Sequence, residues 1–231
     1  ADLYDTLPNT NVCLKAFTDD GKPPESEVLT PLQMKTELDW TLDRFLTKHA
    51  TAKKVGFTQQ QEEIIESARA RFAVPLSKID YYFEMLRIFT MMGDGHTQLR
   101  FPFQDTLYLD LPFKWLMDDG LVVCRNTKKL RLGDRVKSIG GATPEELTDL
   151  LAFMVPHENE YWIRANAWDV LRRGSSLAYV GLLNPDRTVD VEIVRDGRTI
   201  VLRLPLTTSG ASAEGPSVPM DWRIEEAHNL G

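Results

Sequence analysis

The segment from Met91 to Leu99 reads Met-Met-Gly-Asp-Gly-His-Thr-Gln-Leu and carries the clearest chemical potential in the chain. It places His96 on a glycine-rich turn between a segment of helical periodicity and one of alternating polarity. The unperturbed pKa of histidine lies near neutrality, so a presented imidazole can be the general base that activates a hydroxyl nucleophile. The alternative is a capping turn in which His96 is structural.

Asp94 lies two residues before His96 and could act in either of two ways. Its carboxylate could orient the imidazole, or it could cap the turn. Because Asp-Gly is itself a turn signal, the sequence favours the capping role.

The other residues of nucleophilic or metal-binding type form no convincing centre. Gly174–Ser176 is a formal candidate for a serine nucleophile, expected on a turn between a helix and a strand, but it lacks the Gly-x-Ser-x-Gly elbow. His157 is expected on a loop before a helix, and His49 and His228 lie near expected element ends. Since no two histidines have the spacing of a metal site, we expect no metal and no cofactor.

Three amphipathic helices are expected before the histidine. The first begins at Thr30, with proline at its first position, and the second opens with a capping box at Thr58 and Gln61. The third begins near Ser77, and Gly93 supplies its left-handed end. Their apolar stripes are Met34, Leu38, Leu42, Phe45 and Leu46; Ile64, Ile65, Ala68 and Phe72; and Ile79, Tyr82, Phe83, Leu86 and Phe89.

After His96 the apolar period changes from 3.6 to 2, which predicts strands. The strands are expected at 97–101, 107–111, 121–124, 132–139, 189–193 and 200–204. The last two are joined by Asp196-Gly197, a strong hairpin signal. Two helices interrupt them, with apolar stripes Leu147, Leu150, Leu151 and Met154, and Trp162, Ala165, Trp168 and Leu171.

Composition excludes several classes of protein. The 231 residues are 42% hydrophobic and 26% charged, as in an ordinary globular protein, and the net charge is −7. Basic residues form no patch with interleaved aromatics, so we expect no nucleic-acid partner. No apolar run approaches the roughly 18 residues that cross a bilayer. Cys13 and Cys124 could form one disulfide, and the sequence leaves their pairing open.

The strand at 132–139, its Gly140-Gly141 turn and the helix start at Pro144 resemble the Leu-x-x-Gly-Asp-x-Val core of a PDZ domain. The Asp196-Gly197 hairpin matches the closing strands of that fold. The resemblance implies an exposed strand edge to which an extended peptide can add. The chain departs from the pattern in lacking a Gly-Leu-Gly-Phe-like loop and in carrying a tryptophan-rich helix over 159–173.

The Gly-Asp-Gly-His-Thr segment, followed by a PDZ-like module, resembles the tail-specific (C-terminal processing) and tricorn-like serine peptidases over residues 30–206. The peptide-processing branch usually has proline where this chain has Gly95, so the chain looks closer to the tricorn-like branch. The resemblance implies that His96 is the general base, and that a following domain supplies the serine and the oxyanion hole. It also implies a peptide or unfolded protein as substrate, a possible homo-oligomer, and an exported protein whose signal has been removed.

We therefore expect an α+β protein with an irregular N-terminus and helical subdomain at 1–95. Strands and a PDZ-like module follow at 96–206, and a linker at 207–231 leads into a missing catalytic domain. The expected function is the N-terminal portion of a serine peptidase, inactive by itself, with His96 as the only assigned catalytic residue. The alternative is a peptide-binding or ligand-binding module in which His96 is structural.

Overall fold

The computed structural model describes residues 27–99, 105, 107–116 and 120–208. They form helices and a six-stranded antiparallel sheet, which confirms the α+β class. They fall into two compact units: the described parts of Ala1–Thr106 and Glu145–Val170 form the first, and those of Leu107–Pro144 and Leu171–Gly231 form the second. The division at 1–95, 96–206 and 207–231 stays a prediction.

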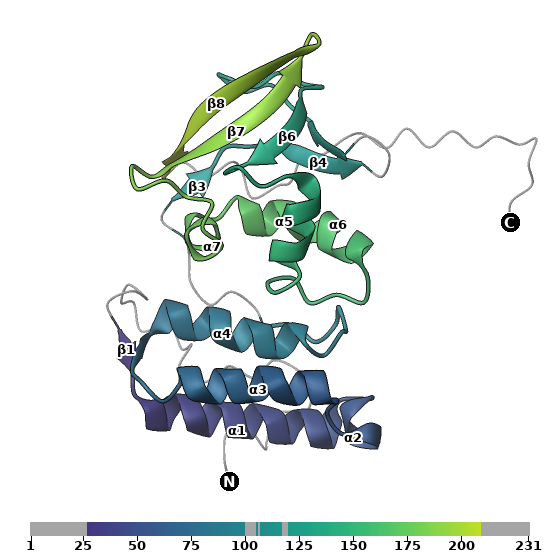
Figure 1. Ribbon diagram of the computed structural model, residues 1–231, viewed down its shortest axis with the longest axis vertical. Coiled ribbons are helices and arrows are strands. Elements are labelled where there is room, and N and C mark those ends of the chain that lie inside the picture. Colours follow the sequence, from purple (N-terminus) through teal and green to yellow (C-terminus); the bar gives the residue numbers. More distant parts are fainter. Residues whose placement is uncertain (1–26, 100–104, 106, 117–119, 209–231) are drawn as a thin grey trace, which may run out of the picture. The chain divides into compact units, whose positions relative to one another are not determined.

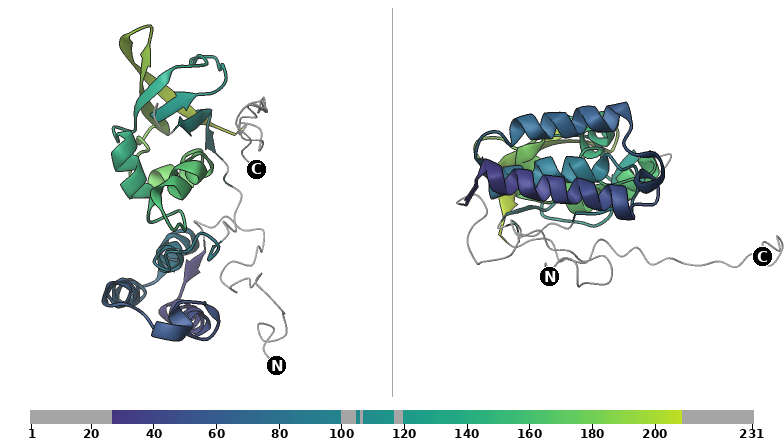
Figure 2. Two further views of the ribbon diagram at one scale, coloured as in Figure 1. Left: turned by 90° about the vertical axis from the view of Figure 1, so that its right-hand side faces the viewer. Right: turned by 90° about the horizontal axis from the view of Figure 1, so that it is seen from below.

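The first unit is helical. Figure 1 shows three of its helices, α1, α3 and α4, side by side, and the left view of Figure 2 shows them nearly end-on. A two-stranded ribbon, β1 with β2, pairs Val28 with Ser77. The elements are β1 (Val28–Leu29), α1 (Pro31–Lys48), α2 (Ala52–Val55), α3 (Gln59–Arg71), β2 (Leu76–Ser77), α4 (Lys78–Thr90), α5 (Pro144–Leu151) and α6 (Glu160–Leu171).

The helix starts read from the sequence are confirmed. Thr30 and Gln33 form a reciprocal capping box, in which Gln33 Oε1 accepts the Thr30 N–H at 2.9 Å. Thr58 and Gln61 form another. Ser77 caps α4 by accepting the Asp80 N–H at 3.1 Å. Each cap satisfies backbone N–H groups that the first helical turn leaves without partners, and so fixes where the helix begins.

Most of the expected apolar stripes are buried. The tightest packing involves residues with no exposed surface: Met34, Leu38, Tyr81, Met85 and Ile88. Leu46 is 42% exposed, so its assignment to the first stripe was wrong. It lies in the last turn of α1, one position beyond Phe45, which is the last buried residue of this helix.

The expected stripe of α6 was wrong except at Leu171, which is buried. The buried positions are Ile163, Ala167 and Leu171, spaced by four residues, whereas Trp162 is 38% exposed. Ala165 is exposed and Trp168 is half-buried. The tryptophans also recur at helical spacing, but the aliphatic residues form the buried face of the helix.

The second unit contains the antiparallel sheet, in the order β3-β8-β7-β6-β5-β4. The helix of this unit, α7, spans Gly174–Tyr179. The strands are β3 (Tyr108–Leu109), β4 (Phe113–Leu116), β5 (Gly120–Val123), β6 (Arg135–Ile139), β7 (Thr188–Arg195) and β8 (Arg198–Thr207). Buried and partly exposed residues alternate along β7, with Val189, Val191 and Ile193 fully buried. This is the period-2 pattern of a strand with one covered face.

Several strand predictions need correction. Residues 97–99 form no strand, and residues 100–104 lie outside the described residues. The strand expected at 107–111 is only two residues long. The strand expected at 132–139 begins at Arg135, because residues 132–134 form a turn that leaves Leu132 66% exposed. The β7–β8 hairpin through Asp196-Gly197 is confirmed, with both turn residues at positive φ.

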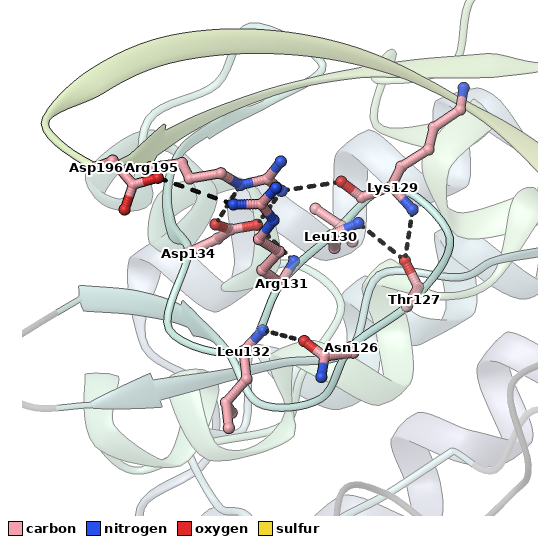
Figure 3. A network of polar contacts seen from close by, with 9 residues as sticks. All are labelled: Asn126, Thr127, Lys129, Leu130, Arg131, Leu132, Asp134, Arg195 and Asp196. Carbon is pink, nitrogen blue, oxygen red and sulfur yellow. Dashed lines mark hydrogen bonds and ion pairs between the residues drawn. The ribbon is translucent and has the colours of Figure 1, made fainter.

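Polar contacts hold the loop of residues 126–134 against the turn end of this hairpin, where β7 finishes (Figure 3). Asn126 Oδ1 accepts the Leu132 N–H at 2.8 Å, and Thr127 Oγ1 accepts the Leu130 N–H at 3.1 Å. Asp134, 3% exposed, accepts hydrogen bonds from Arg195. Asp134, from the Gly-Asp pair of the PDZ-like motif, thus stabilises the structure of this unit.

Among the helices in the described ranges, none combines the length and apolar content that crossing a membrane requires.

Candidate active site

His96 lies on a turn that follows α4, and we call residues 93–98 the histidine turn. Helix α4 ends at Thr90, and Gly93, at φ +62°, lets the chain reverse as the sequence predicted. Gln61 of α3 donates from its amide nitrogen to Met91 O at 2.9 Å and so fixes the end of α4. The turn therefore starts from a fixed point.

Asp94 caps the histidine turn, as the sequence favoured. Its Oδ1 accepts the His96 N–H at 2.9 Å, and its Oδ2 accepts the Thr97 hydroxyl at 2.7 Å. Burial by itself raises the pKa of Asp94, but these hydrogen bonds and the neighbouring His49 outweigh it and lower the pKa below the usual value. The carboxylate is thus engaged with the backbone of the turn.

The histidine that faces Asp94 is His49, which the sequence left without a role. Its Nδ1 accepts the N–H groups of Thr51 and Ala52 at 3.3 and 3.4 Å, so in the neutral ring the proton lies on Nε2. That buried Nε2 lies 3.4 Å from Asp94 Oδ2, an ion-pair distance longer than a well-formed hydrogen bond. His49 therefore links the end of α1 to the histidine turn.

Gly95 is buried between two side chains of the segment that begins α6. Its N–H donates to Glu158 Oε1 at 3.0 Å. A Cβ at Gly95 would lie 2.9 Å from Glu158 Oε2 and 3.0 Å from Trp162 Nε1, closer than real Cβ atoms stand. The absence of a side chain at Gly95 therefore leaves room for this second segment, and Glu158 and Trp162 are the residues that approach.

The imidazole of His96 is presented outward while its backbone is held. The residue is exposed, and its ring nitrogens make no hydrogen bond within the described part of the chain. The ring lies 6.4 Å, centroid to centroid, from the Trp162 ring, at an interplanar angle of 54°. Gln98 closes the far side of the turn by donating to Gly95 O at 2.6 Å. A fixed backbone with a free imidazole is the arrangement that a general base needs.

The formal serine candidate is not on a turn between a helix and a strand. Gly174–Ser176 lies in the first turn of α7, and Ser176 is 3% exposed. The buried Ser176 hydroxyl cannot reach the carbonyl of a peptide substrate, whereas Ser175 is half-buried. The prediction of its location was wrong, and the decision not to assign it as nucleophile is unaffected.

The remaining candidates are dispersed. His157 lies on the loop before α6, as predicted, with Nδ1 2.6 Å from Val155 O. Cys124 has a free thiol, whose pKa burial raises. His228 and Cys13 lie outside the described residues. Within the described ranges, no group of three or more His, Cys, Asp or Glu side chains is arranged to hold a metal ion.

Comparison with known proteins gives a likeness of fold. No family model and no curated protein matches the sequence. Two solved structures of CPAF, a chlamydial serine protease, are similar: mature CPAF complexed with lactacystin, and a serine-to-alanine mutant. Each has a TM-score of 0.52 and 16% identity, and they cover 76% and 77% of this chain.

The chain spans 35% and 34% of the length of those two solved chains. At this identity the likeness shows a shared fold.

Proposed function

We propose that the chain is the N-terminal portion of a serine peptidase of the tail-specific, tricorn-like class, and that His96 is its general base. The observation that carries the proposal is the exposed His96 imidazole on a turn held by Asp94 and Glu158. The fold shared with CPAF supports it, as does the small share of the CPAF chain that this sequence covers.

In the proposed reaction, His96 removes the proton from a serine hydroxyl as the serine oxygen attacks the carbonyl of a peptide bond. The protonated imidazole then gives that proton to the leaving amine, and an acyl-enzyme forms. We propose that the serine, the third residue of the triad and the oxyanion hole belong to a further domain of the full-length protein. This chain alone is then inactive, in keeping with the burial of Ser176.

The proposed PDZ-like module, within residues 96–206, would bind or gate an extended peptide. In the six-stranded sheet, β4 is an edge strand, and among the described residues it pairs with β5 alone. An edge of this kind can accept a further strand. A display library with free C-termini tests this part, with enrichment of hydrophobic terminal residues as the expected result. The proposal further includes a peptide or unfolded protein substrate, possible homo-oligomers, and export from the cell.

The central test replaces His96 by alanine in the full-length protein, with His157→Ala as the matched control. We expect turnover of a casein substrate to fall by roughly three orders of magnitude or more in the first variant, because removing a triad member has effects of that size. The melting temperature should change little, because His96 is exposed. Turnover at the wild-type level in the folded His96→Ala protein would mean that His96 is structural and that the chain belongs to a binding module.

A further inference from the structure

Glu158 reaches the histidine turn from a distant part of the sequence. Its carboxylate accepts the Gly95 N–H across a separation of 63 positions. Glu158 immediately precedes Asn159, whose side-chain oxygen accepts the Trp162 N–H at 3.1 Å at the start of α6. The cap of α6 therefore sets where the Glu158 backbone lies, and the side chain extends from there to the turn.

The contact fits closely around Gly95. Glu158 Oε2 and Trp162 Nε1 lie only 2.9 and 3.0 Å from where a Cβ at this position would stand. Gly95 is bonded directly to His96. The hydrogen bond to the Gly95 N–H fixes the peptide group between Asp94 and Gly95, and so fixes the direction in which the chain runs into His96. Only a residue without a side chain allows this approach.

The next N–H along the chain is held in the same way by a different segment. Asp94 accepts from His96, and Glu158 accepts from Gly95, so two successive backbone donors are bonded to two carboxylates. Neither donor is free to stabilise an oxyanion. Both serve instead to hold the backbone of the imidazole that we assign as general base.

We propose that Glu158 is a positioning residue for His96. This inference rests on the proposed function, because a positioned imidazole matters only if it transfers a proton. The Glu158 carboxylate holds the Gly95–His96 backbone. Without this carboxylate, the imidazole moves out of the position in which it can accept the serine proton. The packing of α6 does not depend on it, because Ile163, Ala167 and Leu171 supply the buried face.

The test compares Glu158→Ala, Glu158→Gln and the control Glu160→Ala. Glutamine keeps an acceptor oxygen for the Gly95 N–H but has no charge. Glu160, two residues further along, forms an ion pair with Arg164 at 3.0 Å. Within the described part of the chain, it forms no hydrogen bond or ion pair with the histidine turn. In this chain we expect Glu158→Ala to speed exchange of the Gly95 amide proton about tenfold, since one hydrogen bond is lost. Exchange in Glu158→Gln and Glu160→Ala should stay near wild type.

The same three substitutions in the full-length protein separate positioning from stability. For Glu158→Ala we expect kcat to fall about 10- to 100-fold with KM nearly unchanged, because small displacements of a catalytic group have effects of this size. Glu158→Gln should restore most of kcat, and Glu160→Ala should leave it unchanged. An unchanged kcat in Glu158→Ala, or an equal fall in all three variants, would overturn the positioning role while leaving the general base in place. Wild-type activity in His96→Ala would instead overturn the proposed function itself.

Discussion

Asp134 and Arg195 are joined by two nearly parallel hydrogen bonds (Figure 3). The Arg195 Nε lies 2.8 Å from Asp134 Oδ1, and its Nη2 lies 2.6 Å from Oδ2. The same carboxylate accepts the Arg131 N–H at 2.7 Å, and Arg195 also donates to Lys129 O at 2.9 Å. This pair ties the turn before β6 to the end of β7 through a planar match of guanidinium and carboxylate.

Replacing Asp134 by asparagine should destabilise the second unit. The change leaves the guanidinium without its buried countercharge and removes one acceptor of the pair, so we expect the free energy of unfolding to fall by about 3 kcal/mol. Urea unfolding at pH 7 measures this. The control is Asp149→Asn, at an exposed position of α5, which should have little effect. Equal stability of the two variants would contradict the role assigned to the pair.

Acid should remove the contribution of Asp134. Hydrogen bonds from Arg195 hold its pKa below the usual value, against the opposing effect of burial. A lowered folded-state pKa stabilises the protein at pH values above about 3.9, the unfolded value for aspartate, and this stabilisation is lost as the pH falls through the folded-state pKa. The difference in stability between wild type and Asp134→Asn should therefore be full at pH 7 and shrink below about pH 4. Unfolding curves at several pH values test this, and a pH-independent difference would refute it.

Alanine at position 95 should strain the histidine turn. The added methyl group would overlap Glu158 Oε2, which can move, and the Trp162 indole, which is rigid. We expect a loss of about 1–3 kcal/mol in the free energy of unfolding, as for other overpacked sites. The double variant Gly95→Ala/Trp162→Ala is the internal control, because removing the ring should relieve part of that loss. If the losses of unfolding free energy in Gly95→Ala and Trp162→Ala simply add in the double variant, the close approach of Trp162 to Gly95 is not the cause of the destabilisation.

His49 should also support the histidine turn, through its contact with Asp94. His49→Ala removes the Nδ1 acceptor of two N–H groups at the start of α2 and the ring that faces Asp94, so we expect a loss of about 1–2 kcal/mol. His49→Asn offers a capping oxygen but is too short to reach Asp94. Hydrogen exchange of the His96 amide should be faster in both variants, and thermal stability should be lower mainly in His49→Ala. If hydrogen exchange of the His96 amide is unchanged in both variants, His49 does not support the histidine turn.

The sequence was sufficient where structure depends on neighbours in the chain. The capping residues Thr30, Thr58 and Ser77, the turn at Gly93 and the Asp196-Gly197 hairpin act over three or four residues, and each lies where it was expected. Short elements without such signals, including α2 and β4, were missed. Two-residue strands and single helical turns carry too few residues for a period to be recognised.

Contacts between distant segments could not be read from the sequence. Nothing in the linear pattern identifies Glu158 as the acceptor of the Gly95 N–H. The tryptophans of α6 were assigned to its apolar stripe from their helical spacing, whereas the structure exposes Trp162 beside His96. In both cases the tertiary environment decides between roles that the sequence leaves equivalent.

The separation of Gly95 and Glu158 also has a consequence for the order of folding. The first unit is discontinuous in sequence, because residues 107–144 of the second unit lie between its two parts. Contacts across so long a loop are costly in entropy and form late. During synthesis, the segment that holds Gly95 emerges from the ribosome before Glu158 has been made. The backbone of His96 is therefore held by Glu158 only after the chain has been synthesised past α6. The residue can act as a general base only when the unit around it is complete.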